Sequence, residues 1–348
     1  MLIKDHPIAS IIIPCRNEKR YIAKCLDYIV DNDYPKDKLE VLVIDGISND
    51  GTREIIKKYA NSYSFIQLLD NYKKIVPSAM NIGIKKAKGN VIIRMDAHSG
   101  YPKDYISKIV LWLIKSDADN VGGIWITLPC TETTNAQAIA YALSSPFGVG
   151  NAMFRIGVKE PTFVDTVPYG AYRKEVFEKV GLFDEDMVRN QDDEFNLRLI
   201  KNGGKILLVP EIVSYYYPRD SLSKLWRMYY QYGYFKPLVA LKVGKVLTWR
   251  QFIPAAFISI LTISGILAIL FKPSGWFFLF LLLMYSLTNI GISSSIAFKK
   301  GFKYLLVLSI TFATLHFSYG FGYLKGIWEF VILRKNKRNK IKDIPLTR

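Results

Sequence analysis

Apolar residues in the N-terminal part of the chain recur in two alternating patterns. Four short runs rich in β-branched residues are typical of buried strands, namely Ile8–Ile13, Val41–Ile44, Phe65–Leu69 and Val91–Met95. Between or before these runs, apolar residues follow helical spacing in Tyr21–Asp31, Arg53–Tyr59 and Ser78–Lys86. Strands that alternate with helices predict an α/β fold with a doubly wound, largely parallel sheet.

The C-terminal part contains three apolar stretches of about twenty residues each, at 252–271, 276–298 and 304–324. A helix of that length rises far enough to cross a hydrocarbon core of about 30 Å. No charged residue interrupts the first two, which we expect to span. The third carries a small and polar stripe around His316, Ser318 and Gly320, so it could span, re-enter or lie in the interface.

The basic residues create a conflict over topology. If the N-terminal domain is cytosolic and all three stretches span, the basic tail from Arg334 to Lys340 lies outside, against the positive-inside tendency. The short connection at Lys299 and Lys300 would be correctly inside.

Between the two parts, Leu222, Leu225, Trp226 and Tyr229 recur at helical spacing beside basic residues. Such a segment could be a core helix or an interfacial one. The hydropathy pattern therefore predicts an α/β domain over 1–220, an amphipathic helical linker over 221–250, a membrane domain with two to three transmembrane helices over 251–333, and a basic tail over 334–348.

Composition narrows the possible partners. The chain has a net charge of +17, and much of the excess lies close to the apolar stretches, where anionic lipid is the natural partner. No helix-turn-helix, zinc-finger or RNA-binding signature is present, so nucleic acid is disfavoured. The 3 cysteines, Cys15, Cys25 and Cys130, form no CxxC pair and predict neither disulfides nor a thiolate metal site. The N-terminal apolar run is too short for a signal peptide, which favours a cytosolic domain.

Polar clusters follow three of the expected strands. Arg16-Asn17-Glu18 follows the first, Asp45-Gly46 the second, and Asp96-Ala97-His98 the fourth. Ligands of such sheets bind at the carboxyl ends of the strands, so these clusters are candidate binding loops. Asp50-Gly51-Thr52 is typical of a helix cap, which makes Asp45 the better functional candidate.

Two further groups are candidates for chemistry. Asp96 and His98 can turn toward one cation, and both are competent ligands for Mn²⁺ or Mg²⁺, although an Asp-x-His sequence is often only a turn. Three acids, Asp192, Asp193 and Glu194, open an amphipathic helix. Acids there stabilise the helix dipole, but clustered carboxylates also raise one another's pKa, so one general base could be among them.

Taken together, these motifs resemble family 2 glycosyltransferases of GT-A fold, and most closely the succinoglycan-type (ExoA-like) exopolysaccharide enzymes. The resemblance runs from Ile11 to Arg198 in order, through 11–18, 45–52, 96–98, 144–150, 165–173 and 191–198. It therefore covers nearly the whole α/β domain.

The resemblance implies a role for individual residues. The metal motif falls on Asp96 and His98, and the catalytic base on Asp192. Arg219 matches a basic residue near the diphosphate in relatives. The remaining substrate-binding candidates are Pro14, Arg16, Glu18, Asp45, Asp96, Gly170 and Arg198.

Three positions depart from the usual family pattern. His98 replaces a second metal aspartate, Gly46 occupies a position often held by an aspartate that reads uracil, and Gln191 replaces a glutamate. The first change affects the affinity and preference for the metal. The second affects which nucleotide base the donor carries, and the third removes a charge beside Asp192.

The implied function is an inverting transfer from a metal-bound nucleotide sugar, expected to be a UDP-sugar, to a polyprenyl-linked saccharide at the cytosolic face of the cytoplasmic membrane. A polyprenyl-phosphate monosaccharide synthase is the main alternative, because it shares the domain. A processive polysaccharide synthase is disfavoured, because such enzymes usually carry a Gln-x-x-Arg-Trp motif. The only similar sequence here is Lys224-Leu225-Trp226-Arg227. A non-catalytic membrane scaffold with the same fold is the alternative from another class.

Overall fold

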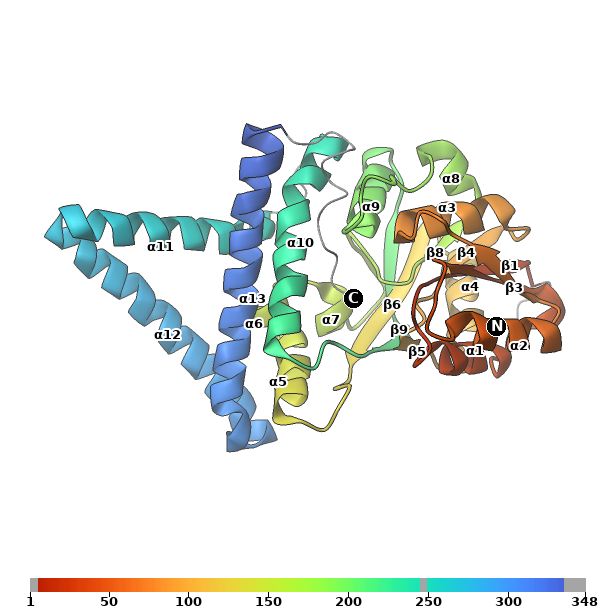
Figure 1. The fold of residues 1–348 in the computed structure, drawn as a ribbon, viewed down its shortest axis with the longest axis horizontal. Coiled ribbons are helices and arrows are strands. Elements are labelled where there is room, and N and C mark those ends of the chain that lie inside the picture. Colours follow the sequence, from red (N-terminus) through yellow and green to blue (C-terminus); the bar gives the residue numbers. More distant parts are fainter. Residues whose placement is uncertain (1–5, 245–248, 335–348) are drawn as a thin grey trace. The chain divides into compact units, whose positions relative to one another are not determined.

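The computed structural model describes residues 6–244 and 249–334, and the chain divides into two compact units (Figure 1). Unit 1 comprises Met1–Ile126 and Met153–Tyr216, and unit 2 comprises Thr127–Ala152 and Tyr217–Arg348. The predicted division at residue 220 stays a prediction. Residues 127–152 lie within the expected α/β domain in sequence, but they belong to the same compact unit as the C-terminal helices. Apart from Arg334, the predicted basic tail lies outside the described residues.

One half of the sheet in unit 1 is parallel. Its strands lie in the order β3-β2-β1-β4, with bounds β1 (Ala9–Cys15), β2 (Leu39–Asp45), β3 (Ile66–Asp70) and β4 (Val91–Arg94). Cys15 pairs with Asp45, and Asp45 with Asp70, so three strands end at the same level. These are the four strands that the apolar runs predict.

The other half of the sheet is antiparallel. The order continues from β4 through β8 (Ala171–Arg173), β6 (Asn120–Thr127), β9 (Ile206–Tyr216) and β5 (Ser99–Gly100), with β7 (Thr162–Phe163) paired to β9. The predicted α/β fold class is thus confirmed. The sheet is mixed rather than largely parallel.

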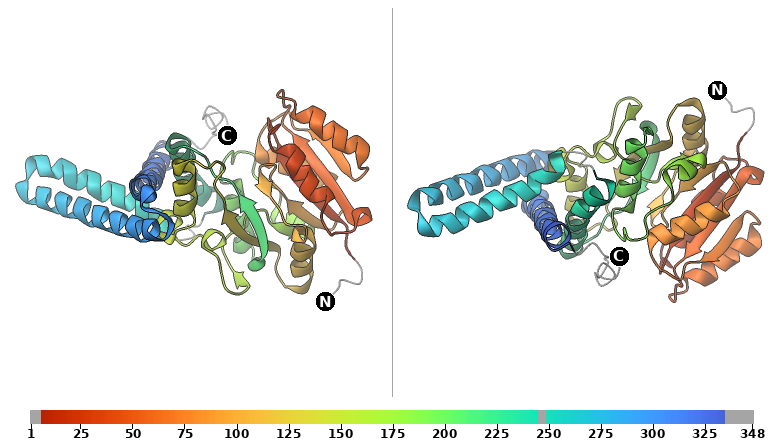
Figure 2. Two further views of the ribbon diagram at one scale, coloured as in Figure 1. Left: turned by 90° about the horizontal axis from the view of Figure 1, so that it is seen from below. Right: turned by 90° about the horizontal axis from the view of Figure 1, so that it is seen from above.

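Alternate residues of β1 enter different hydrophobic cores. Ile11 and Ile13 join a cluster with α1 (Ile22–Val30), α2 (Thr52–Ser62) and α4 (Tyr105–Lys115). Ile12 joins a second cluster with α3 (Val76–Lys86), α8 (Glu175–Val180) and α9 (Gln191–Lys201). Helices therefore cover both faces of the sheet (Figure 2), as the two-sided apolar pattern requires. A short α7 (Met153–Ile156) completes the unit.

Unit 2 is helical. Its elements are α5 (Thr134–Leu143), α6 (Pro146–Val149), α10 (Leu222–Val243), α11 (Ile253–Leu270), α12 (Lys272–Lys300) and α13 (Leu305–Gly326), and a π-helical turn, Ile327–Ile332, extends α13. Three helical segments, 253–270, 272–300 and 302–332, are long and apolar enough to cross a membrane. Helices α11 and α12 form a hairpin that extends away from α13, and α13 lies beside α10 (Figures 1 and 2).

Candidate functional site at the carboxyl ends of the parallel strands

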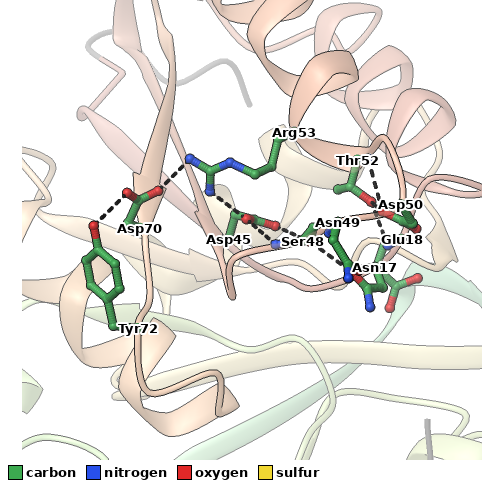
Figure 3. Close-up of polar contacts among 10 residues, drawn as sticks. All are labelled: Asn17, Glu18, Asp45, Ser48, Asn49, Asp50, Thr52, Arg53, Asp70 and Tyr72. Carbon is green, nitrogen blue, oxygen red and sulfur yellow. Dashed lines mark hydrogen bonds and ion pairs between the residues drawn. The ribbon is translucent and has the colours of Figure 1, made fainter.

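Hydrogen bonds from backbone N–H groups to side-chain hydroxyls join the loops after β1 and β2 (Figure 3). The Asn17 N–H donates to Ser48 Oγ at 2.8 Å, and the Glu18 N–H donates to Thr52 Oγ1 at 2.9 Å. Asn17 has a φ of 54°, a left-handed conformation that an asparagine tolerates better than most residues. The conformation of the first candidate loop therefore depends on the second.

Asp45 is fully buried beneath these loops. Its carboxylate accepts hydrogen bonds from the Ser48 N–H at 2.9 Å and from Arg53 Nη1 at 2.7 Å. The other Nη of Arg53 donates to Asp70 at 2.8 Å, so Arg53 links the ends of β2 and β3 (Figure 3). In this arrangement Asp45 orients Ser48 and Arg53. Its predicted contact with the nucleotide stays a prediction.

Gly46 leaves room for Arg16. A Cβ atom at position 46 would lie 3.0 Å from Cδ and 3.1 Å from Cβ of Arg16, closer than most real Cβ contacts. A larger side chain in that place would push Arg16 aside. The position of Arg16 therefore depends on having glycine at position 46, where the usual family pattern has a second aspartate. Arg16 directly follows β1, the strand that contains Pro14.

Asp96, His98 and Glu18 come from two loops at this edge of the sheet. The Nδ1 atom of His98 lies 3.6 Å from Oε1 of Glu18, and the side chain of His98 is 41% exposed. Carboxylate and imidazole donors suit Mn²⁺ or Mg²⁺. Within 6–244 and 249–334, no cluster of three or more His, Cys, Asp or Glu residues could hold a metal ion. A cation here would need oxygen atoms from a ligand, which a diphosphate can supply.

Arg94 connects Asp96 with Asp192. Its Nε lies 3.0 Å from Oδ1 of Asp96, and its Nη1 lies 3.4 Å from Oδ2 of Asp192. Burial opposes its charge, but Asp96 and Asp192 hold the pKa of Arg94 above its ordinary value. Arg94 is not among the site residues that the sequence predicts. The available signal is an arginine at the last position of an otherwise apolar buried strand.

Asp192 lies in the first turn of α9, just after Asn190, which has a φ of 58°. Its side chain remains 43% exposed. Partial removal from water raises the pKa of Asp192, Arg94 opposes that rise, and the neighbouring charges of Asp193 and Asp96 add to it. A carboxylate with a raised pKa and an accessible side chain is suited to accepting a proton.

Arg198 lies one turn beyond Glu194 in α9 and contacts protein groups. Its guanidinium donates to both carboxylate oxygens of Glu194, at 2.7 and 2.9 Å, and to the carbonyl oxygens of Val180 and Leu182. Glu194 is only 3% exposed. These contacts fasten α9 to the end of α8 and the residues after it, which is a structural function. The predicted contact of Arg198 with substrate stays a prediction.

Gly170 lies where a side chain would not fit. A Cβ atom there would lie 2.1 Å from Oδ1 of Asn120, and the carbonyl oxygen of Gly170 accepts a hydrogen bond from the Arg94 N–H at 3.1 Å. The preceding Tyr169 has a φ of 48°, and its hydroxyl lies 2.6 Å from Ser99 Oγ. Gly170 thus supports the backbone of Arg94. Its role toward substrate, like that of Arg219 in unit 2, stays a prediction.

Comparison with known proteins assigns the family. The model of glycosyl transferase family 2 matches residues 10–181, which include the loops after β1, β2 and β4. A Methanococcus voltae dolichyl N-acetyl-alpha-D-glucosaminyl phosphate 3-beta-D-2,3-diacetamido-2,3-dideoxy-beta-D-glucuronosyltransferase is 37% identical over 239 residues, covering 67% of this chain and 74% of its own. The chain belongs to glycosyl transferase family 2. It is therefore a glycosyltransferase of glycan biosynthesis.

Two other relatives extend the similarity. The succinoglycan biosynthesis protein ExoA of Rhizobium meliloti is 28% identical and covers 92% of this chain and 95% of its own, so this family 2 chain matches it beyond the α/β unit. The mannosyltransferase PcManGT of Pyrobaculum calidifontis, solved in complex with GDP-Man and Mn²⁺, has a TM-score of 0.58 at 18% identity. It covers 94% of this chain and 88% of its own, and confirms the fold.

Proposed function

We propose that this chain moves a sugar from a nucleoside diphosphate sugar to a polyprenyl-linked saccharide at the cytosolic face of the membrane, with inversion at the anomeric carbon. The proposal rests on the two ion pairs of Arg94. One guanidinium contacts both the expected metal ligand, Asp96, and the expected general base, Asp192.

The donor end of the site is formed by the loops after β1, β2 and β4. The bonds between Asn17 and Ser48, and between Glu18 and Thr52, preorganise two of these loops before a ligand binds. We expect a UDP-sugar, although Gly46 leaves the choice of base to experiment, and PcManGT was solved with GDP-Man. A divalent cation held by Asp96 and His98 would neutralise the charge that develops on the leaving diphosphate.

Asp192 is the proposed general base. The acceptor oxygen forms a bond to C1 of the donor sugar while the bond from C1 to the diphosphate oxygen breaks, and the hydroxyl proton passes to the Asp192 carboxylate. Attack and departure on opposite faces of C1 invert its configuration. The raised pKa and 43% exposure of Asp192 support this role.

The relatives and the C-terminal helices support a lipid-linked acceptor. The Methanococcus voltae relative is named for a dolichyl-phosphate-linked sugar, and the Rhizobium meliloti relative for succinoglycan biosynthesis. Three helical segments of the present chain are long and apolar enough to cross a membrane. A membrane-bound enzyme meets a polyprenyl carrier in two dimensions, which raises its effective concentration.

A polyprenyl-phosphate monosaccharide synthase is the second candidate. The observation that favours it is the ion pair between Arg94 and Asp192, which lowers the basicity of that carboxylate. A lipid phosphate is already ionised and needs no general base. If Asp192→Asn leaves turnover intact with saturating polyprenyl phosphate, this candidate replaces the first.

The test uses the full chain in detergent with a panel of UDP- and GDP-sugars and Mn²⁺, with and without membrane lipid extract. Release of nucleoside diphosphate and the mass of the lipid-linked product are followed together. We expect release to depend on the extract, and a product heavier by one sugar residue. Donor binding without transfer to any lipid fraction would contradict the proposal, and absence of donor binding would favour a scaffold.

A further inference from the structure

We infer that α13 does not cross the membrane but lies along its surface, and that the hairpin of α11 and α12 is the part that enters the hydrocarbon core. The inference concerns unit 2 alone and does not depend on the transfer reaction. Length and composition admit all three segments as spans. The distinction comes from what covers each helix.

Helices α11 and α12 leave most of their large apolar side chains exposed. In an apolar stretch of 18 residues taken from each of the segments 253–270, 272–300 and 302–332, the fractions of residues that are buried are 17%, 6% and 44%. The large exposed side chains of the hairpin include Ile260, Ile263, Ile266, Ile269, Phe277 and Phe280. With 18 residues, α11 rises about 27 Å, close to the thickness of a hydrocarbon core. The hydrocarbon core of a membrane is an environment that suits such a surface.

The first half of α13 is covered by the segment 127–152. Tyr304, just before α13, donates a hydrogen bond to Gln137 of α5, and the ring of Phe147 in α6 packs against Phe312 at 5.0 Å. His316 Nε2 lies 2.7 Å from the carbonyl oxygen of Phe147. Helix α5 has 10 residues and rises only about 15 Å, too little to cross. Both ends of 127–152 continue into unit 1, so this segment stays on the side of the α/β unit.

The second half of α13 is covered by α10. Cβ atoms at Gly322 and Gly326 would lie 2.1 and 2.2 Å from the carbonyl oxygens of Tyr230 and Tyr234, so the two backbones touch. Tyr234 also donates a hydrogen bond to Glu329 at 2.8 Å. Helix α10 carries four basic residues spread along its length, Lys224, Arg227, Lys236 and Lys242. Charges at the bilayer centre are costly, so a pair containing α10 is not expected to cross.

The uncovered positions of α13 lie mainly along one apolar face, which the hairpin covers at Phe317. Exposed residues that recur at helical spacing along α13 and the turn that follows include Leu306, Ile310, Phe321, Trp328 and Ile332. Trp226 of α10, itself 39% exposed, packs beside Phe321 at 6.4 Å. Exposed lysines lie beside this apolar face, with Lys299, Lys300 and Lys303 near one end and Lys325 between Phe321 and Trp328. An apolar face with lysines beside it suits a bilayer surface that contains anionic headgroups.

The arrangement of the hairpin agrees with this assignment. Figures 1 and 2 show α11 running steeply across α13, with the turn of the hairpin well away from α13. If the hairpin inserts into the membrane, α13 and α10 lie near the membrane plane. Both ends of the hairpin and Arg334 then stay on the side of the α/β unit. The conflict between three spans and a basic C-terminal tail disappears, because the chain enters and leaves the membrane on one side.

Depth measurements distinguish a surface helix from a spanning one. Spin labels are placed on the full-length Cys130→Ser protein at Leu306→Cys, Phe321→Cys and Ile332→Cys, in liposomes containing phosphatidylglycerol. Cys15 and Cys25 are buried and can remain. We expect similar, shallow depths by power saturation with oxygen and a nickel chelate. Labels at Ile260→Cys and Ile269→Cys on α11 are the matched control and should differ in depth. A depth that passes through the bilayer centre between Leu306 and Ile332 would overturn the inference.

Sidedness gives an independent test. Cys130 is exposed, lies in 127–152 and marks the side of the α/β unit without any substitution. Arg334→Cys adds a second thiol at an exposed position. In inverted membrane vesicles, a membrane-impermeant maleimide should modify both thiols. Modification of Cys130 alone, with the introduced thiol reached only after the vesicles are opened, would show that α13 spans. Retained donor binding serves as the folding control.

Discussion

The Nη1 atom of Arg94 lies 3.4 Å from the Oδ2 atom of Asp192. The same guanidinium holds Asp96 through its Nε atom at 3.0 Å. Arg94, at the end of β4, therefore contacts two carboxylates that are almost a hundred positions apart in the chain. Asp96 follows the same strand, and Asp192 lies in the first turn of α9. The charge of Arg94 also opposes the rise in the pKa of Asp192 that partial removal from water causes.

Asp192→Asn should abolish most of the transfer while leaving the donor bound. An amide cannot accept the hydroxyl proton, and loss of a general base costs about 10² to 10⁴ in kcat. Asp193→Asn is the matched control, because it removes a charge from the same helical turn. Steady-state kinetics and donor calorimetry check both variants. Equal losses in the two variants would contradict the assignment of the base to Asp192.

The pH dependence of transfer should report the raised pKa of Asp192. The carboxylate must be ionised to accept a proton, so kcat falls as the pH falls through that pKa. The fall begins at a higher pH than an ordinary aspartate would give. Arg94→Met removes the cation that opposes the rise, so the acidic limb should move to still higher pH. Arg94→Lys keeps a cation and should move the limb less. An unchanged limb in Arg94→Met would show that Asp192 does not control it.

Periodicity predicts the parallel half of the sheet because β1 to β4 are short apolar runs with turn residues between them. The antiparallel half lacks this signal. Pro210 and Glu211 interrupt β9, and Gly122-Gly123 in β6 has the composition of a turn. The structure explains the glycines, because a Cβ atom at Gly123 would lie 1.9 Å from the carbonyl oxygen of Ile212. Such close approaches between distant segments leave no local pattern in a sequence.

The candidate site is only partly predictable for the same reason. Polar clusters at strand ends identify the loops that contain Asp45, Asp96 and His98. Arg94 was missed because its importance comes from Asp192, far away in the chain. The grouping of 127–152 with α13 was also missed, since these residues contact one another only through tertiary packing.

Arg198→Met should destabilise unit 1. The change leaves the carboxylate of Glu194, which is 3% exposed, without the guanidinium that it contacts. Removing one partner of a buried ion pair lowers the free energy of unfolding by about 3–5 kcal/mol. Adding Glu194→Gln removes the stranded charge and should recover part of the loss in a thermal melt. A variant with unchanged stability but a much higher KM for the donor would instead support the predicted substrate contact.

Gly170→Ala should also destabilise unit 1, by overpacking. The new Cβ atom would lie 2.1 Å from Oδ1 of Asn120, so backbone or side chains must shift, at about 1–3 kcal/mol. Asn120→Ala removes the opposing oxygen, and the double variant should be more stable than Gly170→Ala alone. Thermal melts of the three variants check this. Because Gly170 accepts a hydrogen bond from the Arg94 N–H, we also expect a lower kcat in Gly170→Ala.

The cation requirement should depend on His98 more than on its neighbour Glu18. His98 and Asp96 are the proposed protein ligands, and His98 lies 3.6 Å from Glu18. His98→Ala should raise the Mn²⁺ concentration for half-maximal activity by about tenfold or more, as losses at metal sites generally do. His98→Asp replaces the imidazole nitrogen with a carboxylate oxygen, and since oxygen ligands suit Mg²⁺ better than imidazole does, it should shift the preference toward Mg²⁺. Glu18→Gln is the control and should change the requirement less. If metal titrations of His98→Ala and the parent protein coincide, His98 is not a ligand, and Asp96 must act with other groups.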